Sequence, residues 1–138
     1  MAAAEGPEPG AAPIVELRVS AEPSQLSIVR AVSAAIAGQA DFDLDAIADV
    51  RLAMDEACSI LIVRAIPGTA LSCRFSTGIN RLAVAISAPV IDTESTGQRS
   101  FGWHVLSTLT DSIEMTHGLD AESTVATIQF TKNKVDDA

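Results

Sequence analysis

The stretch Asp55–Ala65, DEACSILIVRA, places two adjacent carboxylates directly before a run of large aliphatic side chains. Apolar residues recur at helical spacing from about Leu44 to Ile66, and Pro67-Gly68 ends the pattern. The pattern predicts one long helix whose C-terminal end is apolar almost all round and is therefore buried. An acid beside such a segment is either a solvated charge at the rim of the helix or a site residue.

A strand and a helix are predicted on the N-terminal side of this long helix. Residues Ile14–Ser20 alternate apolar and polar side chains, which is typical of a strand with one buried face. Residues Pro23–Gly38 carry apolar side chains at helical spacing, and the glycine ends the pattern. Arg30 falls on the more polar side of this helix.

On the C-terminal side, the pattern predicts two strand pairs separated by a loop and a short helix. A turn at Gly78–Asn80 joins the first pair, and a turn at His117–Asp120 joins the second. The loop, Pro89–Ser100, is polar, and the short helix begins at Gly102. The predicted strands are Thr69–Ser76, Arg81–Ser87, Ile113–Thr116 and Thr124–Thr131.

The order of these elements predicts the fold class. Strands come in adjacent runs rather than in alternating strand–helix units, which favours an α+β fold. We expect a mostly antiparallel mixed sheet with the helices packed on one face. The predicted domain is residues 13–132, between a disordered N-terminal tail (1–12) and a frayed C-terminal tail (133–138).

Composition excludes several classes of function. The formal net charge is −9, and the nine basic residues form no cluster, so nucleic-acid binding is not predicted. No apolar run is long enough to span a membrane, and the N-terminus lacks the pattern of a signal peptide. Cys58 and Cys73 lie in apolar segments without metal-ligand spacing, which predicts two buried thiols in a reducing compartment. We therefore expect a cytoplasmic protein.

Three segments carry a resemblance to a known family: LRVSAEPSQLSIVRAVSAAIAG, LDAIADVRLAMDEACSILI and RSFGWHVLSTLTDSIEM. Together with the order of elements, they resemble the anti-sigma factor branch of the GHKL (histidine-kinase-like) ATPases, which includes the RsbW, SpoIIAB and UsfX types. The resemblance covers roughly Val15 to Phe130. It implies the Bergerat fold, a two-layer α+β sandwich.

The motif of this family on the long helix reads E-A-x-x-N. Its Glu is the base that acts on an attacking hydroxyl or water, and its Asn binds Mg²⁺. Glu56 and Ala57 match the motif, whereas Ile60 stands at the Asn position. Because Mg²⁺ prefers oxygen ligands, Ile60 cannot replace the Asn. The resemblance therefore makes Glu56 a candidate general base or the vestige of one, and it predicts no metal ligand at residue 60.

The other nucleotide motifs of the family are only partly matched. Ser87 stands where the D-x-G-x-G box has its Asp, and no glycine follows it. The G-x-G-F box resembles Ser100–Trp103, which retains Gly102. The resemblance implies Ser87, Ser100 and Gly102 as nucleotide contacts, with ATP and Mg²⁺ as the cofactors. Since phosphoryl transfer depends on the metal ion, the departures predict altered or degraded nucleotide chemistry.

Each candidate residue also has a simpler interpretation. Glu56 is either the base or a solvated acid on the helix edge, and Asp55 is expected to be a surface charge. Arg30 is either a partner-docking residue, as the first helix of the resembled anti-sigma factors implies, or an ordinary solvated arginine. Trp103 and Phe101 are expected to form a core anchor or, alternatively, to cap the helix or form an exposed contact patch. His104 is expected to lie on the helix surface.

Three functions remain after this reasoning. The preferred one is an anti-sigma factor that sequesters an alternative sigma factor of the stress or sporulation type. An anti-anti-sigma factor with a STAS domain would release it by partner switching. The second is a Mg-ATP-dependent serine-protein kinase that phosphorylates this antagonist, and the third is an interaction module unrelated to transcription. The family also implies a homodimer, for which the N-terminal strand at a sheet edge offers a surface.

Overall fold

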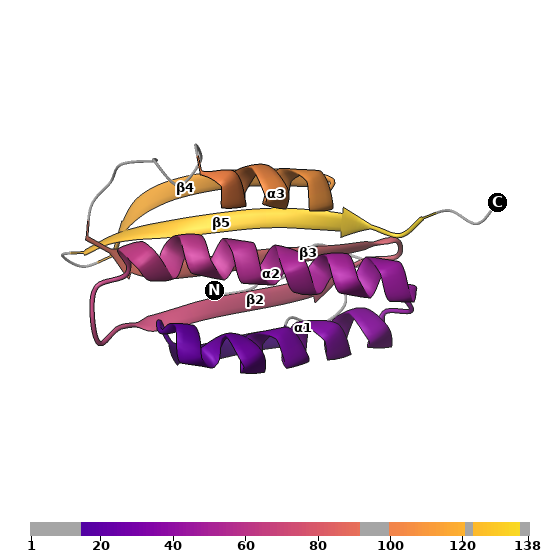
Figure 1. Ribbon diagram of the computed structural model, residues 1–138, viewed down its shortest axis with the longest axis horizontal. Coiled ribbons are helices and arrows are strands. Elements are labelled where there is room, and N and C mark those ends of the chain that lie inside the picture. Colours follow the sequence, from indigo (N-terminus) through magenta and orange to yellow (C-terminus); the bar gives the residue numbers. More distant parts are fainter. Residues whose placement is uncertain (1–14, 92–99, 121–122, 136–138) are drawn as a thin grey trace, which may run out of the picture.

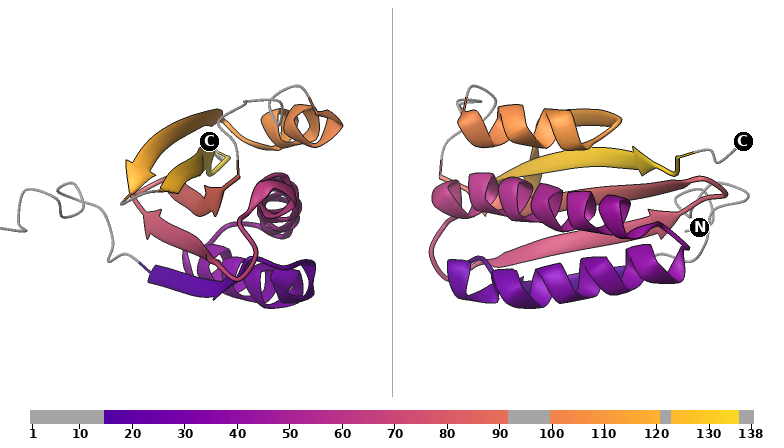
Figure 2. Two further views of the ribbon diagram at one scale, coloured as in Figure 1. Left: turned by 90° about the vertical axis from the view of Figure 1, so that its left-hand side faces the viewer. Right: turned by 45° about the vertical axis from the view of Figure 1, so that its right-hand side comes forward.

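The computed structural model describes residues 15–91, 100–120 and 123–135. The described strands form one sheet in the order β1-β2-β3-β5-β4, and every neighbouring pair is antiparallel. All three α-helices lie on one face of the sheet (Figures 1 and 2), which confirms the predicted α+β fold. The elements are β1 (Val15–Ser20), the 3-10 helix η2 (Pro23–Gln25), α1 (Leu26–Gln39), α2 (Leu44–Arg64), β2 (Ala70–Thr77), β3 (Arg81–Val90), α3 (Phe101–Leu109), β4 (Ser112–Asp120) and β5 (Ser123–Asn133).

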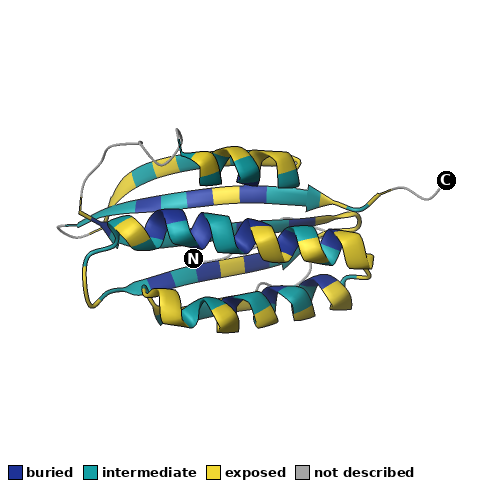
Figure 3. Ribbon diagram, viewed as in Figure 1, coloured by how far each residue is buried: buried dark blue, intermediate teal, exposed yellow. Residues whose placement is uncertain are grey.

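The core lies between the helices and the sheet, with α2 in the central position (Figures 1 and 3). Side chains of β3 alternate between buried and half-buried, so every second residue faces the helices. The α2 residues that face the sheet include Met54, Ala57 and Leu61, each 0% exposed. The end of this helix is not buried all round, because Val63 is 83% exposed. The sequence-based expectation of full burial there was wrong for that face.

Helix α2 begins and ends at identifiable signals. The Asp43 side chain caps the first turn by accepting a hydrogen bond from the Ala46 amide at 2.8 Å. The helix ends at Arg64, two residues before the predicted end. Pro67 follows, and the helical conformation is unfavourable for the residue that precedes a proline. Ala65 instead forms an isolated bridge with Val90 of β3.

Strand β3 is longer than predicted and runs through Pro89 to Val90. The pairing of β2 with β3 stops at Ser87, so the last residues of β3 have β5 on one side only. The Pro89 carbonyl accepts a hydrogen bond from the Ile66 amide at 3.0 Å on the side that β2 has left. The proline nitrogen faces that same side, away from β5. Its lack of an N–H group therefore removes no hydrogen bond from the pairing of β3 with β5.

The C-terminal hairpin is also longer than predicted. His117–Asp120 continues β4 rather than forming a turn, since Gly118 pairs with Val125 of β5. Turn-forming residue types here are overridden by the cross-strand ladder. At the other end, β5 includes Asn133 and the Lys134 amide donates to the Asn80 carbonyl at 2.8 Å, so the expected frayed tail begins later. The predicted N-terminal tail, most of the loop after β3, and residues 136–138 lie outside the described residues.

The face of the sheet turned away from the helices is called here the open face. None of the described elements covers it (Figure 2). Its residues are small or polar along the three central strands, namely Ser72, Arg74 and Ser76 of β2, Ala83, Ala85 and Ser87 of β3, and Thr127, Gln129 and Thr131 of β5. Among the described residues, no helix is both long and apolar enough to cross a membrane.

Candidate functional site

Glu56 lies at the contact between α2 and the first turn of α3. A Cβ atom placed on Gly102 would be 2.7 Å from the Glu56 Oε1 atom and 3.7 Å from the Ser100 Oγ atom. Ser100 is the N-cap of α3, and its hydroxyl oxygen accepts a hydrogen bond from the Trp103 amide at 3.0 Å. The structure therefore brings together three of the predicted site residues: Glu56, Ser100 and Gly102.

Ile60 lies one turn after Glu56 on α2 and belongs to the core. Its exposed fraction is 9%, and it is one of the buried hydrophobic residues between the layers. An aliphatic side chain in this position offers no oxygen ligand to Mg²⁺. Among the described residues, there is also no group of three His, Cys, Asp or Glu side chains that could hold a metal ion. The residues present therefore do not fit a Mg²⁺ site of the kind that the family motif implies.

Ser87 is not part of this arrangement. Its neighbours in β3, Ile86 and Ala88, are 0% and 1% exposed and face the helices. Ser87 therefore points to the open face, where it pairs with Ser72 and Thr127. The sheet separates it from Glu56, so the predicted nucleotide contact at Ser87 has no geometric support from the α2–α3 site.

Arg30 of α1 contacts Asp55 of α2 rather than standing alone. Its Nη1 atom lies 3.4 Å from the Asp55 Oδ2 atom, and the two side chains are 40% and 25% exposed. The other carboxylate oxygen, Oδ1, is buried without a hydrogen-bond partner among the described residues. Asp55 is thus a half-buried interhelical partner, and the expectation of a plain surface charge was wrong. Sequence spacing gave no sign of this pair, because its members are 25 positions apart.

Lys132 is a further structural residue that the sequence did not reveal. Its Nζ atom lies 3.0 Å from the Asp49 Oδ2 atom and donates to the Leu109 carbonyl oxygen, also at 3.0 Å. The side chain is only 17% exposed. It therefore joins β5 to α2 and to the C-terminal end of α3, where a positive charge is favourable.

The aromatic residues of α3 have different environments. Trp103 is half-buried and packs against the core, as expected of an anchor. Phe101 is 80% exposed, and His104 is exposed on the helix surface. Phe101 is therefore not a core anchor, and a contact role for this exposed side chain stays a prediction.

The two cysteines are free thiols inside the core, as predicted. Both are 0% exposed, and their side chains hydrogen-bond to each other. This hydrogen bond, together with burial, raises the pKa of the Cys58 thiol well above its usual value. The same bond lowers the pKa of the Cys73 thiol, although burial opposes that effect. Burial of both sulfur atoms predicts low reactivity in the native protein.

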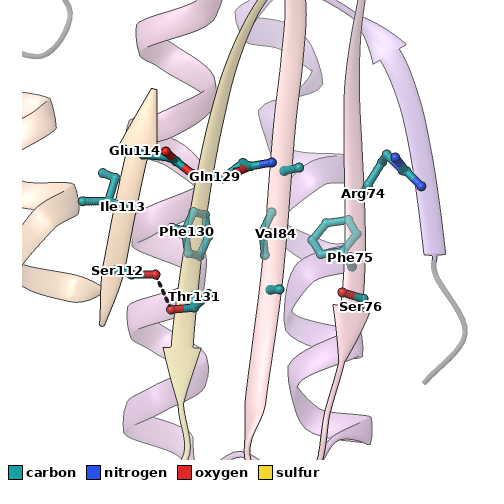
Figure 4. A pocket seen from close by; sticks show the side chains of 12 residues that line it. Arg74, Phe75, Ser76, Val84, Ser112, Ile113, Glu114, Gln129, Phe130 and Thr131 are labelled. Carbon is teal, nitrogen blue, oxygen red and sulfur yellow. Dashed lines mark hydrogen bonds between the residues drawn. The ribbon is translucent and has the colours of Figure 1, made fainter. Parts of the chain in front are cut away.

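A shallow groove of about 550 Å³ lies on the open face (Figure 4). Its floor is Ala83 and Ala85 of β3, and its polar side chains include Arg74 of β2 and Glu114 of β4. Arg74, Ala85 and Glu114 belong to one row of paired residues across β2, β3, β5 and β4, and Ala83 belongs to the neighbouring row on the same face. The groove is therefore on the opposite side of the sheet from Glu56, and it is not a nucleotide pocket formed by the predicted site residues.

Residues 19–130 match the model of the histidine kinase-like ATPase domain. This match covers most of the chain, and it agrees with the antiparallel sheet and the three helices on one face. The chain belongs to the family of histidine kinase-like ATPase domains.

Within that family, the chain is similar to the anti-sigma-F factor RsbW from two strains of Mycobacterium tuberculosis. In both comparisons, the identity is 37% over 103 residues, which is 75% of this chain. The matched part is 61% of the length of each relative, so the chain spans about three fifths of those proteins.

Proposed function

We propose that this protein is an anti-sigma factor that sequesters an alternative sigma factor of the stress or sporulation type. The observation that carries the proposal is the 37% identity to proteins named anti-sigma-F factor RsbW, over 75% of this chain. An anti-anti-sigma factor with a STAS domain competes for the same protein and releases the sigma factor. Both partners act where transcription takes place, in the cytoplasm.

The outer surface of α1 and α2 is the docking surface in this proposal. Ile28 of α1 and Leu52 of α2 are 46% and 51% exposed, so both helices present apolar area to solvent. Arg30 is half-exposed, and the carboxylate that holds it is incompletely satisfied. An acidic group of the partner can therefore replace Asp55 as the ion-pair partner of Arg30 at a modest cost in free energy, because the internal ion pair is partly solvated.

Sequestration needs surface complementarity and no catalysis. The buried Ile60 supports this non-catalytic interpretation over the serine-protein kinase alternative, since the side chain provides no ligand for the metal ion on which phosphoryl transfer depends. The anti-sigma function therefore does not require ATP.

A homodimer is part of the same proposal. Strand β1 is at an edge of the sheet, where its outer side has no strand partner among the described residues. Light scattering on the purified protein then gives twice the chain mass of 14.3 kDa. A mass of a single chain at micromolar concentration would contradict the dimer and leave the sigma-binding proposal untouched.

The function is tested by transcription with purified RNA polymerase and the candidate sigma factors of the same cell. The protein is expected to inhibit transcription that depends on one of them, and the matching anti-anti-sigma factor is expected to restore it. Inhibition of none of the sigma factors would contradict the proposal and would favour an interaction module outside transcription.

Arg30→Ala tests the docking surface in the same assay. We expect binding to the sigma factor to weaken by about tenfold or more, as for other interfacial arginines that carry binding energy. Arg81→Ala is the control, because Arg81 is an exposed arginine at the start of β3, outside the surface of α1 and α2. Equal effects of the two variants would contradict a specific role for Arg30.

A further inference from the structure

The close approach of Glu56 to Gly102 gives both residues a role that the nucleotide motifs do not describe. Gly102 lies in the first turn of α3, and an ideal Cβ atom there would be only 2.7 Å from the Glu56 Oε1 atom. Real Cβ atoms essentially never approach a neighbour so closely, so a side chain at residue 102 would displace the flexible end of the Glu56 side chain from its present place. The absence of a side chain at residue 102 is therefore what allows the Glu56 carboxylate to reach the backbone of α3.

The place that the carboxylate occupies is electrostatically special. The first turn of a helix carries amide groups without partners inside the helix, and their summed dipoles attract negative charge. At this end, the Ser100 hydroxyl oxygen accepts a hydrogen bond from the Trp103 amide. Glu56, which is half-buried, supplies a full negative charge beside the same turn.

We propose that Glu56 and Gly102 form an interhelical lock, in which the Glu56 carboxylate is the resident anion of the N-terminal end of α3. The lock holds α3 against α2. It also leaves this helix end unsuited to a nucleotide phosphate, which would face the negative charge of Glu56 instead of unpaired amides. Gly102 is required for the room that it gives to a carboxylate of the same chain, and Glu56 is a structural anion rather than a general base.

A glycine-to-alanine substitution tests the lock through the sign of its effect. In an ordinary helical position, Gly→Ala is stabilising, because alanine has the higher helix propensity. Gly38 of α1 is such a position, since an added Cβ would meet only the Ile47 Cδ1 atom at 4.0 Å. We expect Gly38→Ala to raise the Tm of the full chain by about 2–4 °C.

At Gly102, the same substitution is expected to have the opposite effect. The new Cβ displaces the flexible end of the Glu56 side chain, so Gly102→Ala is expected to lower Tm through the lost attraction between the carboxylate and the helix end rather than through a rigid clash. The change is then repeated in the Glu56→Ala background, where the colliding oxygen is gone. There we expect Gly102→Ala to cost much less than in wild type or to become stabilising, since the two sites are coupled. A Tm change at Gly102 that is stabilising in wild type, or that is identical in both backgrounds, would overturn the lock.

Glu56→Gln separates the charge from the shape of the side chain. The amide is nearly isosteric but neutral, so this variant is expected to have a lower Tm than wild type. The difference in Tm is expected to become much smaller in 1 M NaCl, because salt screens the charge in wild type.

Mg-ATP is the probe for the second part of the proposal, with calorimetry as the readout. Wild type is expected to show no saturable binding at 1 mM Mg-ATP. Saturable binding that Glu56→Gln weakens without lowering Tm would overturn the proposal and return Glu56 to the role of a base. Because all of these readouts use the protein without a sigma factor, their failure is distinguishable from failure of the proposed function.

Discussion

At the scale of single residues, the site is defined by contacts between positions that are remote in the sequence. Glu56 reaches Gly102, and Arg30 reaches Asp55. The resemblance to a known family pointed to Glu56, Ser100 and Gly102 together, and the structure brings all three to one end of α3. It did not point to Asp55, because a pair between two helices leaves no periodic signal in either helix.

Ser100 provides a direct test of the cap at this end of α3. Ser100→Ala removes the hydroxyl that accepts a hydrogen bond from the Trp103 amide, so the free energy of unfolding is expected to fall by about 1 kcal/mol. Urea denaturation followed by Trp103 fluorescence measures it. Ser107→Ala is the control, since this exposed hydroxyl donates only to the His104 carbonyl within the same helix. A larger loss at residue 107 than at residue 100 would contradict the capping role.

The thiols give a second test at this scale. Cys58 and Cys73 are both 0% exposed, so neither is expected to react with a thiol-specific reagent in minutes while the protein is folded. In urea, both react. Rapid native reaction of one or both sulfur atoms would show that the core opens at the contact between α2 and β2.

At the scale of elements, Lys132 connects β5 with α2 and α3 through Asp49 and the Leu109 carbonyl. Lys132→Met keeps an unbranched side chain that is one atom shorter and removes the charged amino group, so two oxygen atoms lose their donor. We expect a loss of roughly 1–3 kcal/mol in the free energy of unfolding. Arg74→Met is the matched control, because the Arg74–Glu16 pair is exposed at both ends and spans 3.6 Å. Similar losses for the two variants would contradict the connecting role of Lys132.

The elements also show where sequence patterns were sufficient. Alternation found β1, whose Leu17 and Val19 are half-buried against the core, and helical spacing found α1 and α2, each of which buries one face. The patterns failed where long-range pairing overrode local propensity. Pro89 continues β3 because the pairing with β2 stops at Ser87, and Gly118 continues β4 because β5 lies beside it. Neither fact is present in the local sequence.

At the scale of the whole molecule, the two faces have different characters. The helical face carries Arg30 and the exposed apolar residues Ile28 and Leu52, which suits a specific partner. The open face carries small and polar residues around a groove between Arg74 and Glu114. Because the formal net charge of the chain is −9, we expect the partner to be a protein rather than a nucleic acid.

We propose that this protein binds a sigma factor without the help of a nucleotide. The most direct test is a binding titration of the purified chain against a panel of alternative sigma factors, each with and without Mg-ATP. We expect tight binding to one member of the panel, with the same dissociation constant in both conditions. Tight binding only in the presence of Mg-ATP would contradict it, because the nucleotide would then act through a helix end that Glu56 is proposed to occupy.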